Sequence, residues 1–146
     1  MANTNQLGVV EVQGKPYPFA ALDALGVRDS YERWMKASAW DELERLKGIV
    51  KPERWAAMEL QLTRDMLAGM HSWGGPIFDS KYQTVEGQKK LLGFMFELAN
   101  PMYDRTVVDQ IYSSQAEADR VVNYMLKFGF DPNSQGAAAK EPPPGN

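Results

Sequence analysis

The stretch PERWAAMELQLTRDMLAGM, residues 52–70, decides the fold, because its apolar side chains recur at the three- and four-residue spacing of an α-helix. Proline stands at the first helical position, where its missing N–H costs nothing. One face carries a continuous line of large apolar side chains: Trp55, Met58, Leu62, Met66 and Met70. Ala56, Leu60 and Leu67 widen this stripe to about half the circumference, which predicts neighbours on more than one side.

A helix is also predicted immediately before this stretch, over about residues 30–47, with Asp29 or Ser30 as its N-cap and Gly48 at its end. Its apolar side chains again follow helical spacing. The predicted inner face consists of Tyr31, Trp34, Met35, Ala39, Leu43 and Leu46.

Four shorter helical segments are predicted after the first two helices. The glycine-rich sequence HSWGGP, residues 71–76, interrupts the helical pattern, and a short turn of helix follows at residues 77–83. Thr84 is a suitable N-cap for a helix that ends at Ala99. The third segment is short, holds Val107, Val108 and Ile111, and has Asp104 as its expected cap. Ser114 and Glu117 form a capping box that starts the last helix, for which Gly129 and Phe130 supply the expected C-terminal cap.

The N-terminal region contains the one stretch that is typical of β-structure. Residues 7–20 are rich in valine and aromatic residues and predict a hairpin with a tight turn at Gly14-Lys15. Pro16 and Pro18 cannot donate backbone hydrogen bonds, so the second strand must lie at an edge. An isolated hairpin is marginal in water and must pack on the helices or pair with another chain. A short helical turn is expected over residues 20–25, ended by Gly26.

The sequence therefore predicts a mostly α fold: a small helical domain of about five helices with an N-terminal β-hairpin and a flexible C-terminal tail. We expect a flexible N-terminus at residues 1–6 and one domain over residues 7–130. Residues 131–146 contain three consecutive prolines, two glycines and no large apolar side chain, which is typical of a mobile tail.

Composition narrows the classes of function. The chain has 146 residues and a net charge of −3, and it shows no basic cluster beyond Lys89-Lys90, so we expect no nucleic-acid partner. It contains no cysteine, which excludes disulfides and zinc–thiolate sites. Neither a signal peptide nor an apolar run of about 20 residues is present, so we expect a cytoplasmic protein without a membrane partner.

No pattern in the sequence supports catalysis. The segment 8–15 has five residues between its glycines and Pro16 after its lysine, so it departs from a phosphate-binding loop. His71, the only histidine, has no second histidine or adjacent carboxylate motif to form a metal site or a catalytic pair. The acidic residues between Asp41 and Glu44 alternate with basic ones, as on a solvated helix face. We predict a protein that is not an enzyme and has no cofactor and no metal; a small enzyme using His71 and Asp41 is the weakest alternative.

Protein binding is the favoured function. Eight methionines and four tryptophans are an excess typical of adaptable binding surfaces or of irregular cores. Trp40 falls among charged side chains of its predicted helix, so it is expected to be at least partly exposed, as an ordinary surface residue or as an interface anchor. Trp73 either binds a partner or fills a helix junction. Val10 and Tyr17 are the corresponding candidates on the hairpin.

Three features together resemble the tail assembly chaperones of long-tailed bacteriophages. They are the Val9–Phe19 hairpin of the form V-x-V-x-G-K-x-Y, the helical region from Ser30 to Phe128, and the Pro/Gly/Ala-rich end EPPPGN, residues 141–146. The resemblance implies a non-enzymatic protein of the host cytoplasm that holds the tape-measure protein until tail-tube subunits polymerise around it, and a longer form made by ribosomal frameshifting. A homo-oligomer is compatible with this function and with the alternative that follows. The alternative is a structural subunit of a phage particle or another large assembly, such as a connector or decoration protein, whose hairpin pairs with a neighbour by strand addition.

Overall fold

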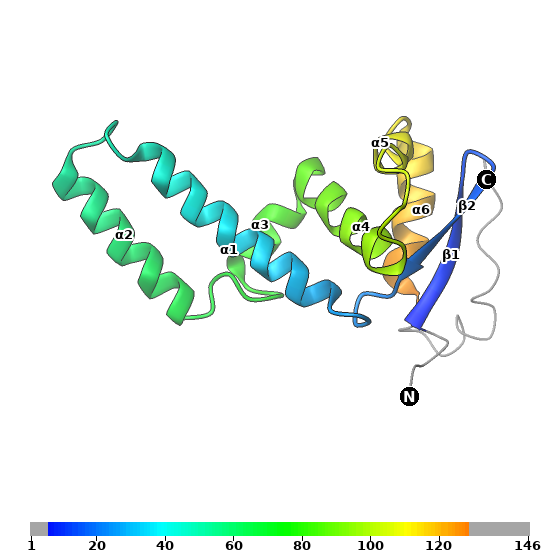
Figure 1. Cartoon of the computed structure of the whole chain (residues 1–146), viewed down its shortest axis with the longest axis horizontal. Helices are drawn as coiled ribbons and strands as arrows, with labels where there is room; N and C mark the ends of the chain where they lie inside the picture. Colours follow the sequence, from blue (N-terminus) through cyan, green and yellow to red (C-terminus); the bar gives the residue numbers. More distant parts are fainter. Residues whose placement is uncertain (1–5, 129–146) are drawn as a thin grey trace. The chain divides into compact units, whose positions relative to one another are not determined.

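The computed structural model describes residues 6–128 and shows two strands and six helices over that range (Figure 1). The mostly helical fold with an N-terminal hairpin is confirmed. The predictions for the ends of the chain, including Gly129, Phe130 and the tail 131–146, lie outside the described residues. The elements are β1 (Leu7–Val12), β2 (Lys15–Ala20), α1 (Val27–Leu46), α2 (Pro52–Leu67), α3 (Pro76–Tyr82), α4 (Val85–Ala99), α5 (Val107–Ile111) and α6 (Gln115–Lys127).

The backbone contacts group these elements into two compact units. The hairpin unit comprises the described residues 6–28 and 89–128, and the central unit comprises residues 29–88. One unit boundary falls in the first turn of α1 and the other in the first turn of α4. Each unit has its own packing and is described separately.

The hairpin unit is built on the antiparallel pair β1–β2, in which Leu7 faces Ala20 and Val12 faces Lys15. The turn lies at Gln13-Gly14, one residue earlier than expected, and both residues have positive φ, +50° and +82°. Two consecutive left-handed residues make a turn whose twist matches that of the strands.

Aromatic rings fix α6 against the inner face of the hairpin. Phe19 is fully buried, and its ring meets those of Tyr124 and Phe128 edge-on, with centroids 5.9 and 5.2 Å away. Gly8 leaves the space that these rings occupy, because an added Cβ would lie 2.7 Å from Phe19 Cζ and 2.9 Å from Phe128 Cε2.

Arg120 provides a polar connection between α6 and β1. Its Nη2 donates to the Glu11 carbonyl oxygen at 2.6 Å and its Nε donates to Glu117 Oε1 at 3.0 Å. Arg120 is buried, so these contacts satisfy a charge that would otherwise be costly in this position.

The N-cap of α6 confirms the predicted start of that helix. Ser114 has extended backbone angles, and its side chain accepts a hydrogen bond from the Glu117 backbone N–H at 3.1 Å. Replacing Ser114 with alanine should lower the free energy of unfolding by ~1 kcal/mol, since that N–H loses its acceptor. Ser113→Ala is the matched control, because Ser113 is exposed and caps nothing at the helix start. Urea denaturation followed by far-UV circular dichroism measures both; equal effects would contradict the capping role.

Asp104 was predicted to cap α5, but it does not occupy the N-cap position of that helix. Thr106 occupies the N-cap position and makes no side-chain cap hydrogen bond. Asp104 Oδ1 instead accepts from the Thr106 backbone N–H at 3.0 Å and from its hydroxyl at 2.7 Å. These hydrogen bonds lower the pKa of Asp104 and close an Asx turn before the helix.

Helix α1 begins at Val27, earlier than the predicted Ser30. Residues 20–25 form turns rather than the expected helical segment, and Leu25 and Gly26 both have positive φ, +53° and +80°. Asp29 falls in the first turn of α1, where its negative charge interacts favourably with the helix dipole.

Candidate functional site

Helix α2 has large apolar side chains but none of its residues is buried. Leu60 is 51% exposed and Leu67 is 85% exposed. The four large apolar side chains on the same face as Trp55 are only half-buried: Trp55, Met58, Leu62 and Met66. A helix of this length is marginal in water by itself and depends on packing of its apolar face. The stripe predicted to have several neighbours is therefore only partly covered within the described chain.

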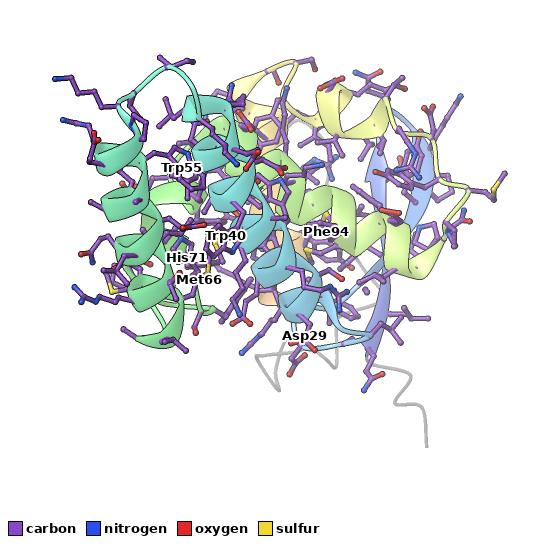
Figure 2. All side chains as sticks on the ribbon, turned by 60° about the vertical axis from the view of Figure 1, so that its left-hand side comes forward. Asp29, Trp40, Trp55, Met66, His71 and Phe94 are labelled. Carbon is purple, nitrogen blue, oxygen red and sulfur yellow. The ribbon has the colours of Figure 1, made fainter. Side chains whose placement is uncertain are left out.

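The side of the central unit where α1 faces α2 carries several of these residues together. Figure 2 labels Trp40, Trp55, Met66 and His71 there. Trp55 Nε1 donates to the Leu43 carbonyl oxygen of α1 at 2.8 Å, which fixes the position of α2.

Trp40 is 38% exposed, which confirms that it is at least partly accessible. It lies four residues from Lys36 and Glu44 along α1, so its exposed ring is bordered by charged side chains. Large aromatic side chains in such settings are typical anchors of protein interfaces. We define the α1–α2 surface as five exposed or half-buried apolar side chains of these two helices: Trp40, Trp55, Met58, Leu62 and Met66.

Trp73 is half-buried and has internal contacts. Its ring centroid lies 4.4 Å from that of Phe78 and 5.8 Å from that of Tyr31. Its backbone N–H donates to the carboxylate of Glu32. These contacts hold the glycine-rich loop against α1 and α3, so Trp73 fills the junction between these helices.

Tyr31 occupies the centre of the aromatic cluster. It is fully buried, and its hydroxyl donates to the Gly87 carbonyl oxygen at 3.0 Å. Burial, with a smaller contribution from Tyr82, raises the pKa of Tyr31 to about 12. The phenol therefore remains a neutral hydrogen-bond donor throughout the physiological range.

His71 is 4% exposed, and its Nδ1 has no hydrogen-bond partner among the described residues. Burial lowers the pKa of His71 below its ordinary value, and Lys36 and Lys81 lower it further. Asp65 acts in the opposite direction without cancelling these effects. The ring is therefore neutral near pH 7, and its position is that of a buried packing residue.

We expect the stability of the central unit to depend on His71 protonation. Because the folded chain binds a proton there less readily than the unfolded chain, stability should decrease as the pH falls below about 6.5. Tryptophan fluorescence in urea reports on this unit, since all four tryptophans lie within residues 29–88. A His71→Leu variant should lose less stability than the original chain between pH 7.5 and pH 5. Identical losses would contradict the prediction.

The hairpin places its two candidate residues in the core. Val10 and Tyr17 point to the buried inner face. The outer face instead exposes Leu7 and Val9, which pair with Ala20 and the exposed Pro18. A partner that docks on the outer face would contact Leu7 and Val9. The valines in β1 occupy both faces, so period-two alternation could not distinguish the sides.

The segments considered for catalysis have ordinary structural roles. Residues 8–15 form a strand and a hairpin turn rather than a strand, loop and helix. Asp41, Glu42 and Glu44 are exposed, and Glu42 forms an ion pair with Arg45 on the same helix. Their positions match the solvated face expected of alternating charges.

Among residues 6–128 no group of three or more histidine, cysteine or acidic side chains is placed to hold a metal ion. Within the same range, every helix is too short or too polar to span a bilayer. Comparison of the chain with protein-family models, curated proteins and solved structures found no match.

Proposed function

We propose that this chain is a non-enzymatic protein-binding protein whose α1–α2 surface receives a helical segment of a partner protein. The observation that carries the proposal is α2, a sixteen-residue helix that presents apolar side chains along its length and buries none of them fully. A partner helix would remove the exposed parts of Trp40, Trp55, Met58 and Met66 from water. Met58 and Met66 lie among these residues, and methionine side chains adapt readily to different apolar surfaces.

Phage tail assembly is the context we propose for this binding. A tail assembly chaperone in the host cytoplasm holds the tape-measure protein, a long helical chain, before the tail tube forms around it. A surface made by two helices with several methionines suits the successive apolar segments of such a partner. The hairpin followed by helices is the arrangement on which this resemblance rests.

Co-expression with the tape-measure protein of the same phage genome tests the proposal. We expect the chain to keep that protein soluble and to co-purify with it. Trp40→Ala should reduce co-purification by about tenfold or more, as loss of an aromatic anchor does. Val9→Ala is the matched control, because it removes an exposed apolar side chain from the hairpin instead. No co-purification with the unaltered chain, or equal losses for both variants, would contradict binding through the α1–α2 surface.

A structural subunit is the second candidate, favoured by the exposed outer face of the hairpin. Leu7 and Val9 lie there beside the exposed prolines of β2, and such an apolar face can pack on a neighbouring subunit. Mass spectrometry of purified particles separates the two functions. A structural subunit remains in the particle at a fixed copy number, whereas an assembly chaperone is absent from it.

A further inference from the structure

A line of exposed side chains runs along the outer side of α2, apart from the residues that pack against α1. Its members recur at intervals of four, three and four residues: Ala56, Leu60, Thr63 and Leu67, here called the α2 seam. At 3.6 residues per turn they fall within a sector of about 60°. Thr63 Oγ1 donates to the Glu59 carbonyl oxygen at 2.9 Å, so the one hydroxyl of the seam is satisfied within the helix.

The spacing of the α2 seam is that of a coiled-coil contact line. Leu60 and Leu67 take the a positions and the small residues Ala56 and Thr63 take the d positions, where they permit close approach of a second helix. Glu59 then occupies the g position and Arg64 the e position, one on each side of the seam. Both are exposed, and neither is in an ion pair within the described part of the chain.

We propose that the α2 seam pairs in parallel with the same seam of a second copy of this chain. In a parallel pair the g residue of one helix lies beside the e residue of the next heptad in the other, five positions further along. Glu59 of each copy would therefore meet the partner's Arg64, giving two ion pairs related by the twofold axis. An antiparallel pair would bring like charges together. The inference concerns the chain without its partner protein and so goes beyond the proposed function.

Sedimentation of the full chain over a wide concentration range tests whether the pair forms. The apparent mass should rise from 16.4 kDa toward twice that value as concentration increases. The double substitution Leu60→Gln and Leu67→Gln should keep the chain monomeric. Both side chains are exposed, so the variant should retain its far-UV circular dichroism. An unaltered chain that stays monomeric, or a dimer unaffected by the substitutions, would overturn the proposal.

Charge reversal tests the parallel arrangement. Glu59→Arg and Arg64→Glu should each weaken association about tenfold at low salt, because each creates two like-charge contacts across the pair. An equimolar mixture of the two single variants should associate as well as the unaltered chain, and so should the double variant. Failure of both to restore association would overturn the parallel pairing.

The self-pairing and the proposed function can fail separately. A monomeric chain that still co-purifies with the tape-measure protein through Trp40 would reject the pairing alone. A dimer sensitive to Leu60 and Leu67 that binds no tape-measure protein would reject the proposed function alone.

Discussion

Replacing Gly87 with alanine should lower the free energy of unfolding of the central unit by ~3 kcal/mol. An added Cβ at this position would lie 2.7 Å from the Lys81 carbonyl carbon and closer still to its oxygen. These are backbone atoms in the last turn of α3, so they cannot move as a flexible side chain would. The Gly87 carbonyl oxygen also accepts the hydrogen bond of the buried Tyr31, and displacement of α4 would weaken that contact.

Local hydrogen bonds leave this turn little freedom to relax. Thr84 Oγ1 donates to the Lys81 carbonyl oxygen at 2.7 Å and accepts from the Gly87 backbone N–H at 2.9 Å, which confirms Thr84 as the cap of α4. Thr84 therefore hydrogen-bonds to the backbone of both residue 81 and residue 87 and keeps them close together. Alanine at position 87 must break these contacts or shift the helix.

Gly93→Ala in the same helix is the matched control for Gly87→Ala. Its added Cβ would meet only the Tyr103 hydroxyl, at an ordinary contact distance of 3.5 Å. Since alanine is the better helix former, this variant should be neutral or more stable by up to ~1 kcal/mol. Urea denaturation followed by tryptophan fluorescence and far-UV circular dichroism measures both variants. Similar stability of the two would contradict the steric explanation.

Sequence periodicity was sufficient to locate α2 and α6 because both have apolar residues at helical spacing and a clear start signal. The capping box at Ser114 and the proline at position 52 are local interactions, so neighbouring residues determine them. The start of α1 depends instead on the left-handed conformation of Leu25, which is uncommon for a residue with a branched side chain. The identity of residue 25 does not predict that conformation.

The candidate surface was predictable in part. The position of Trp40 on a charged helix face indicated its exposure, but its place beside α2 depends on how the two helices pack. The stripe on α2 indicated which side chains avoid water, whereas the incomplete burial of Trp55 and Met66 depends on how few elements of the described chain cover them. An apolar helical pattern does not distinguish a neighbour in the same chain from one in another protein.

Replacing Phe19 with alanine should lower the free energy of unfolding of the hairpin unit by ~3–5 kcal/mol, the usual cost of removing a buried phenylalanine ring. The ring is fully buried and forms the contact between β2 and the aromatic residues at the end of α6. Val9→Thr serves as the control. It changes an exposed residue of the same hairpin and keeps a β-branched side chain, so its effect should be within ~0.5 kcal/mol.

A double-mutant cycle of Gly8 and Phe19 tests whether the Phe19 ring is what requires glycine at position 8. Gly8→Ala alone should cost ~1–3 kcal/mol, because its Cβ would collide with Phe19 and Phe128. When alanine already replaces Phe19, the collision between the new Cβ and the Phe19 ring is absent. The double variant should therefore be at least ~1 kcal/mol more stable than the sum of the two single losses predicts. Urea denaturation by circular dichroism, with amide exchange at Val10 and Val12, measures the cycle. Phe19→Leu replaces the alanine variant if the latter does not fold. Strict additivity would show that the Phe19 ring is not what requires glycine at position 8.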